Sequence, residues 1–96
     1  MALPKLLQSA LWSYDLKKMD KEKHKKTIIT QVLNHGTWEQ VSWVRDNYST
    51  ADIKEAIKKP SRGVWQKDAL NYWIKILDVK VPREKFDRAI FSLKVQ

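Results

Sequence analysis

Apolar side chains recur every three to four residues through most of the chain, as they do along one face of an α-helix. No segment alternates apolar and polar residues in the way of a half-buried strand. Few helix-breaking residues occur, and nearly all of them stand between the periodic stretches: Pro4, Gly36, Pro60, Gly63 and Pro82. The pattern predicts an all-α protein, a compact bundle of five to six short helices.

Two helices are predicted before Gly36. The first covers residues 4–11, where Pro4 suits the first helical turn. The second covers residues 20–34, with Asp20 as its N-cap and Gly36 closing its C-terminal end. Its charged first half gives way to an apolar stripe made of Ile28, Ile29, Val32 and Leu33.

A third helix is predicted to begin at Thr37, which with Gln40 three residues later has the signature of a capping box. Helical spacing places four residues on one face of it: Trp38, Val41, Val44 and Tyr48. Trp43 falls nearly opposite that face. A tryptophan displaced from the stripe of its own helix is either covered by a second layer of the bundle or exposed as an interface anchor. We therefore name Trp43 as the candidate protein interface.

Three further helices are predicted in the second half of the chain. One begins at residue 49 or 50, where Ser49 and Asp52 have the spacing of mutual caps. The next covers residues 64–77 and carries apolar residues over so wide an arc that we expect it to be the central helix. The last opens at Pro82 and keeps one apolar face in register: Phe86, Ala89, Ile90 and Leu93.

The composition fits a single domain over residues 1–96. The chain is 43% hydrophobic and includes five tryptophans, which is enough apolar surface to build one core. Cysteine is absent, which excludes disulfides and thiolate chemistry and agrees with a reducing compartment. The N-terminal stretch lacks the pattern of a signal peptide, and no run of about 18 apolar residues occurs that would cross a membrane. We expect a cytoplasmic protein with no membrane partner.

Catalytic and metal-binding chemistry has no motif to support it. The two histidines, His24 and His35, lack further ligands at helical spacing, so no metal site is predicted. Two glycines are too few to build a phosphate-cradling loop, and no serine stands in a nucleophile motif. The carboxylates stand near lysines as in ordinary surface pairs. We expect a non-enzymatic protein with no catalytic residues, no metal and no cofactor.

The chain is strongly basic, because 19 Lys and Arg against 11 Asp and Glu give a net charge of +8. This balance favours nucleic acid, anionic lipid or an acidic protein as partner. The densest basic run lies within residues 17–26, and we assign it auxiliary phosphate contacts through Lys17, Lys18, Lys21, Lys25 and Lys26. Because acidic residues are interleaved there, a solvated helical turn without a ligand is the alternative.

Residues 37–59 have the outline of a helix-turn-helix element, with two short helices joined by a tight turn. In a DNA-binding unit of this kind, six residues would face the groove or its phosphates: Ser49, Thr50, Lys54, Lys58, Lys59 and Arg62. The alternative is that the two helices are ordinary members of the bundle, because helix pairs of this size are common and the turn contains no glycine.

Four stretches together resemble a family of short, uncharacterised prokaryotic proteins: residues 11–15, 28–36, 43–48 and 69–73. In that family a Trp-x-x-Asp opening precedes an Ile-Ile-x-x-Val-Leu-x-x-Gly helix, a Trp helix that ends in Tyr, and a closing Trp helix. The likeness covers about residues 11–77. It rests on Trp12, Asp15, Gly36, Trp43, Tyr48 and Trp73, and it contains no catalytic signature.

The resemblance implies an all-helical domain whose relatives accompany nucleotidyltransferase-type toxins as suggested antitoxins. We therefore expect a binding module that masks a cognate partner protein and also contacts DNA, with a homodimer as one form of it. A structural subunit of a nucleoprotein assembly, a sequence-independent nucleic-acid-binding protein and a small enzyme remain the alternatives.

Overall fold

The computed structural model describes residues 3–90, and five α-helices joined by short loops make up most of that range. They are α1 (Lys25–His35), α2 (Trp38–Asn47), α3 (Thr50–Lys58), α4 (Lys67–Leu77) and α5 (Arg83–Ala89). Two 3-10 turns precede them, η1 (Lys5–Leu7) and η2 (Leu16–Lys18). Within this range the only β-type pairing is one isolated bridge between Trp65 and Ile90. The predicted all-α bundle is confirmed.

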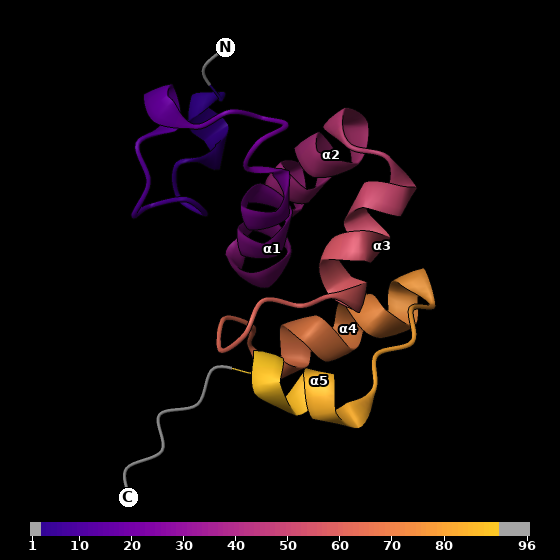
Figure 1. Ribbon diagram of the computed structural model, residues 1–96. Coiled ribbons are helices and arrows are strands. Elements are labelled where there is room, and N and C mark those ends of the chain that lie inside the picture. The colour runs from indigo at the N-terminus through magenta and orange to yellow at the C-terminus, as the bar shows by residue number, and fades with distance from the viewer. Residues whose placement is uncertain (1–2, 91–96) are drawn as a thin grey trace, which may run out of the picture.

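The centre of the bundle is α1, which packs against α2, α3 and α4. Figure 1 shows the N-terminal turns beyond α1 and α2 at one end of the molecule, and α4 and α5 at the other end. The prediction that the helix of residues 64–77 is central was wrong. Only Leu70 and Trp73 of α4 are buried, whereas Tyr72 and Ile76 lie exposed on the surface. The wide apolar arc of α4 therefore leaves an uncovered face.

Both helices predicted before Gly36 are shorter than their sequence pattern indicates. The first is reduced to η1, followed by turns, and the second begins at Lys25 instead of Asp20. The Asp20 carboxylate accepts hydrogen bonds from the backbone N–H groups of Glu22 and Lys23, each at 2.8 Å. These are bonds that an N-cap makes, but residues 21–24 form a turn, and the regular α-helix starts only at Lys25. Repulsion among the neighbouring lysines opposes a regular helix in this turn.

The ends of the middle helices follow the predicted signatures. Thr37 and Gln40 form the complete capping box at the start of α2. Gly36 ends α1, and a Cβ atom there would lie 2.5 Å from the carbonyl oxygen of Val32, so only glycine fits. At the start of α3 the Ser49 hydroxyl accepts the backbone N–H of Asp52, but the reciprocal half of that cap is not formed.

A buried polar contact fixes the loop between α3 and α4. The Asn34 side chain at the end of α1 donates to the carbonyl oxygen of Val64 at 2.9 Å and accepts the N–H of Gln66 at 2.8 Å. Between them, the side chain of Trp65 is completely buried. The last helix follows Pro82 as predicted, while Leu93 of its predicted apolar face lies outside the described residues.

Candidate functional site

The most exposed aromatic cluster lies between α2 and α4. Trp38, the first residue of α2, is 66% exposed, and its ring meets those of Tyr72 and Trp73 edge-on, with centroids 6.1 Å apart in both pairs. Trp73 is itself anchored, because its indole N–H donates to the carbonyl oxygen of Leu33 at 2.9 Å. A large apolar ring is thus held in a defined position at the surface.

This cluster borders a groove of about 550 Å³, which we call the aromatic groove. Its apolar walls come from α2 and α4, with Leu33 of α1 and Ile53 of α3 also in the lining. A smaller hollow of about 200 Å³ adjoins it and shares five lining residues with it: Leu33, Trp38, Val41, Tyr72 and Trp73. The polar residues along the larger groove include Arg45 and Asp46. The surface has the apolar centre and polar rim of a protein-binding site.

Trp43 does not line either of these hollows. It is partly buried against the core, and its ring packs edge-on against that of Tyr48, with centroids 5.9 Å apart. Sequence spacing thus singled out a tryptophan that the fold uses for packing and missed the more exposed Trp38. The wide apolar arc of α4 was the signal that could have found the groove. The interface role of Trp43 stays a prediction.

The six residues predicted to contact nucleic acid do not form one uniform surface. Lys54 and Lys58 project from the exposed side of α3, whereas Thr50 lines the aromatic groove and the Ser49 hydroxyl caps the helix. Lys59 forms an ion pair of 3.0 Å with Glu55. Both α2 and α3 pack mainly on α1. The two helices are therefore members of the bundle, and DNA recognition by a helix-turn-helix unit stays a prediction.

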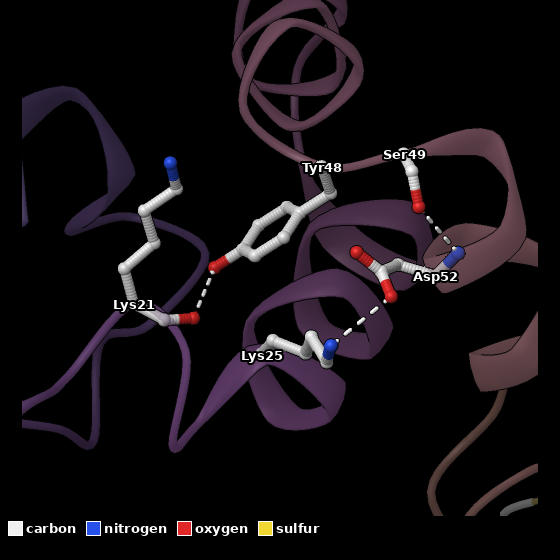
Figure 2. Close-up of polar contacts among 5 residues, drawn as sticks. All are labelled: Lys21, Lys25, Tyr48, Ser49 and Asp52. Atoms are coloured by element: carbon white, nitrogen blue, oxygen red, sulfur yellow. Dashed lines mark hydrogen bonds and ion pairs between the residues drawn. The ribbon is translucent and has the colours of Figure 1, made fainter.

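The lysine run is partly occupied by structural contacts at the junction of α1, α2 and α3. Figure 2 shows the Tyr48 hydroxyl donating to the carbonyl oxygen of Lys21 at 2.8 Å, and the Lys25 ammonium contacting the Asp52 carboxylate at 3.0 Å. The Lys21 ammonium also lies 5.7 Å from the centre of the Tyr48 ring. Burial raises the pKa of the Tyr48 hydroxyl well above its usual range. This junction holds the start of α1 against the turn between α2 and α3.

The remaining residues of the run lie elsewhere. Lys17 and Lys18 are exposed on η2, and Lys26 lies on α1 beside basic residues of the C-terminal half, including Arg62. The structure therefore divides the five lysines among three surroundings. Their predicted auxiliary role in phosphate binding is not a property of one continuous surface.

The contact between Lys25 and Asp52 should respond to pH in a defined direction. The hydrogen bond from Lys25 lowers the pKa of Asp52 below 3.8, and the same bond raises the pKa of Lys25 above 10.5. A carboxylate whose pKa is lowered by folding stabilises the folded state when the pH is above the pKa of the unfolded chain. This contribution disappears as the pH falls through the pKa of the folded state. The raised pKa of Lys25 likewise stabilises the folded state at a pH below 10.5, and this stabilisation is lost as the pH rises through the raised pKa.

We therefore expect Lys25→Gln and Asp52→Asn to be coupled at neutral pH and uncoupled in acid. Urea unfolding of both single variants and the double variant, at neutral pH and again well below pH 3.8, measures that coupling free energy directly. High salt at neutral pH provides the control, because screening should weaken the coupling without protonating Asp52. A coupling of equal size in acid would contradict the assignment.

Two structural features are absent from residues 3–90. No helix in this range is long and apolar enough to cross a membrane. Nor does the range contain a group of three or more His, Asp or Glu side chains placed to hold a metal ion.

Comparison with known proteins gives a family without a function. No curated protein matches the chain, and no solved structure matches it. Residues 6–57 match DUF6922, a family of unknown function, and this segment includes η2, α1, α2, most of η1 and nearly all of α3. The match extends over more than half of the 96 residues. The protein is therefore a member of the DUF6922 family.

Proposed function

We propose that the protein is a non-enzymatic binding module that docks a partner protein in the aromatic groove. The observation that carries the proposal is the exposure of the Trp38 ring, which is held edge-on by two other aromatic rings beside an apolar groove. Leaving such a surface in water is unfavourable, and an ordered aromatic ring loses little conformational entropy on binding. Tryptophans in this setting are frequent anchors of protein interfaces.

The groove fits an amphipathic helix of the partner. Two helices, α2 and α4, form its apolar walls, and this arrangement allows a third helix to place apolar side chains between them. Exposed Tyr72 and Ile76 extend the apolar surface along α4. The net charge of +8 favours a partner with an acidic surface, because long-range attraction accelerates encounter.

An antitoxin-like role is the specific form of this function that we propose. Its support is the resemblance of the chain to proteins that accompany nucleotidyltransferase-type toxins. The docked partner would then be such a toxin, and binding would mask its activity. A structural subunit of a larger assembly is the competing function, and it would bind its partner without suppressing any toxicity.

Capture from the native host with matched variants tests the proposal. Tagged wild type, Trp38→Ala and Trp12→Ala are purified in parallel, and bound proteins are identified by mass spectrometry. We expect one acidic protein to be retained by wild type and Trp12→Ala and lost from Trp38→Ala. Expressing that partner alone should then arrest growth, and coexpression of the chain should restore it. A partner retained equally by Trp38→Ala contradicts docking in the groove, and a harmless partner contradicts the antitoxin role.

A further inference from the structure

Five basic side chains line a second hollow, which shares no lining residue with the aromatic groove. The hollow has a volume of about 300 Å³, and Pro60 is its only lining residue without a positive charge. Its bases come from α1, α5 and the loop that follows α3: Lys26, Lys59, Arg62, Lys85 and Arg88. We call this site the basic hollow. Four of its five bases lie outside the segment that matches the family, because that segment ends at residue 57 and includes only Lys26.

The backbone holds two of these arginines next to each other. The N–H of Gly63 donates to the carbonyl oxygen of Arg88 at 2.8 Å, and the N–H of Trp65 donates to that of Ala89 at 2.8 Å. Gly63 has a φ of +70°, a conformation that favours glycine, so the loop turns sharply just after Arg62. Arg62 and Arg88 are therefore brought together by the fold, although they are 26 positions apart in the sequence.

The positive charge of the hollow is largely uncompensated by protein. Lys59 has an ion pair with Glu55. The other four bases of the hollow form no ion pair with any residue between positions 3 and 90. Acidic residues gather on one flank, where Lys26 and Lys59 also border a neighbouring hollow with Asp52 and Glu55. Like charges gathered in a concave site repel one another, and a bound anion would relieve that repulsion.

We propose that the basic hollow binds the phosphodiester backbone of a nucleic acid without regard to sequence. Arginine forks and lysines are the side chains that contact phosphate oxygens in such complexes. The lining contains no aromatic ring on which a base would stack and no Asn or Gln to pair with adenine, so contact with the charged backbone dominates. None of the large exposed apolar residues lines the hollow, so it lacks the groups that insert into a lipid surface.

This assignment separates the residues that sequence alone had grouped together. Lys59 and Arg62 belong to the basic hollow, whereas Lys54 and Lys58 do not line it. Lys85 and Arg88 of α5 take their place as phosphate contacts. The site binds nucleic acid from the side of α1 and α5, and the exposed face of α3 makes no specific contribution.

The test compares two double variants that remove the same charge. Arg62→Gln with Arg88→Gln removes two bases of the hollow, and Lys54→Gln with Lys58→Gln removes two bases of α3. Fluorescence anisotropy measures binding of the full chain to a labelled DNA duplex of arbitrary sequence over a range of salt concentrations. We expect the hollow variant to lose about tenfold or more in affinity and to lower the salt slope by about 2, since each phosphate contact contributes about 1. The α3 variant should stay within about twofold of wild type, because Lys54 and Lys58 do not line the hollow and exposed charges are screened by salt.

Further arms distinguish the source of the phosphate. Single-stranded RNA and vesicles of phosphatidylcholine with phosphatidylserine are titrated under the same conditions, and circular dichroism confirms that every variant is folded. Binding of RNA in preference to DNA identifies the nucleic acid and keeps the proposal. Equal losses in the two double variants, no binding at low salt, or stronger binding to vesicles would overturn it. Trp38→Ala should retain full duplex affinity, so failure of this site and failure of partner docking give different results.

Discussion

Trp38→Ala is expected to weaken binding of the protein partner by at least about thirtyfold, which corresponds to about 2 kcal/mol, as for a central anchor residue of an interface. The ring is exposed in the free protein and stands where the two apolar hollows meet. Removing it deletes the largest apolar surface offered to the partner. Isothermal titration calorimetry with the captured partner measures the change, and the heat capacity change of binding should become less negative.

The chain supplies two matched tryptophan controls for this experiment. Trp12 is 75% exposed but does not line the aromatic groove, so Trp12→Ala should leave the affinity nearly unchanged. Trp43→Ala tests the interface that sequence spacing indicated. A larger loss of affinity in Trp43→Ala than in Trp38→Ala would move the docking surface to the other side of α2. Trp38→Ala should remain folded, because it removes only edge-on ring contacts worth about 1 kcal/mol each.

Trp65→Ala is expected to reduce the free energy of unfolding by about 3 to 5 kcal/mol, the range found when a large aromatic side chain is removed from a core. Trp65 is completely buried and is the largest such side chain among the described residues. Its backbone is bonded to α5, and its neighbours on both sides are bonded to Asn34 of α1. Because small domains have only about 5 to 15 kcal/mol of stability, this variant approaches the limit of folding. Urea unfolding followed by circular dichroism measures the loss.

Trp65→Phe is the matched control for this second prediction. The buried indole N–H of Trp65 has no acceptor within residues 3–90, and phenylalanine removes this unpaired donor while it keeps an aromatic ring. The loss should therefore be only about 1 kcal/mol. Equal destabilisation by phenylalanine and alanine would contradict this, because it would mean that the indole N–H has a hydrogen-bond partner whose loss destabilises both variants. In that case the effect could not be attributed to packing volume.

Local signals in the sequence were strong enough to predict the five α-helices and several of their ends, although the helix expected at residues 4–11 is only a 3-10 turn. The capping box of Thr37 and Gln40 and the close of α1 at Gly36 depend on residues within one turn of each other. The predicted start of the second helix was wrong. The helix expected from Asp20 begins five residues later, because the charged residues 21–24 form a turn in which neighbouring lysines repel one another.

Sites that join distant segments were less accessible from the sequence. Helical spacing showed that Trp43 lies off the apolar stripe of its helix. Whether Trp43 is buried, however, depends on its packing against Tyr48 and the core. Trp38 shares a stripe with buried residues, yet it lies at the end of that stripe, where α4 contacts its ring only edge-on and leaves most of it exposed. The basic hollow likewise needs Arg62 and Arg88, whose proximity comes from a backbone hydrogen bond across the loop.

The sequence by itself determined the all-α class, the single bundle, the basic character and the residue types available for binding. Periodicity, caps and charge are properties of neighbouring residues, so they can be read along the chain. Only the tertiary structure decided that α1 is central, that α4 presents Tyr72 and Ile76 beside Trp38, and that the basic hollow combines α1, α5 and the loop after α3. The physical reason is that burial and charge convergence depend on which helix faces meet, and that depends on packing between segments far apart in the chain.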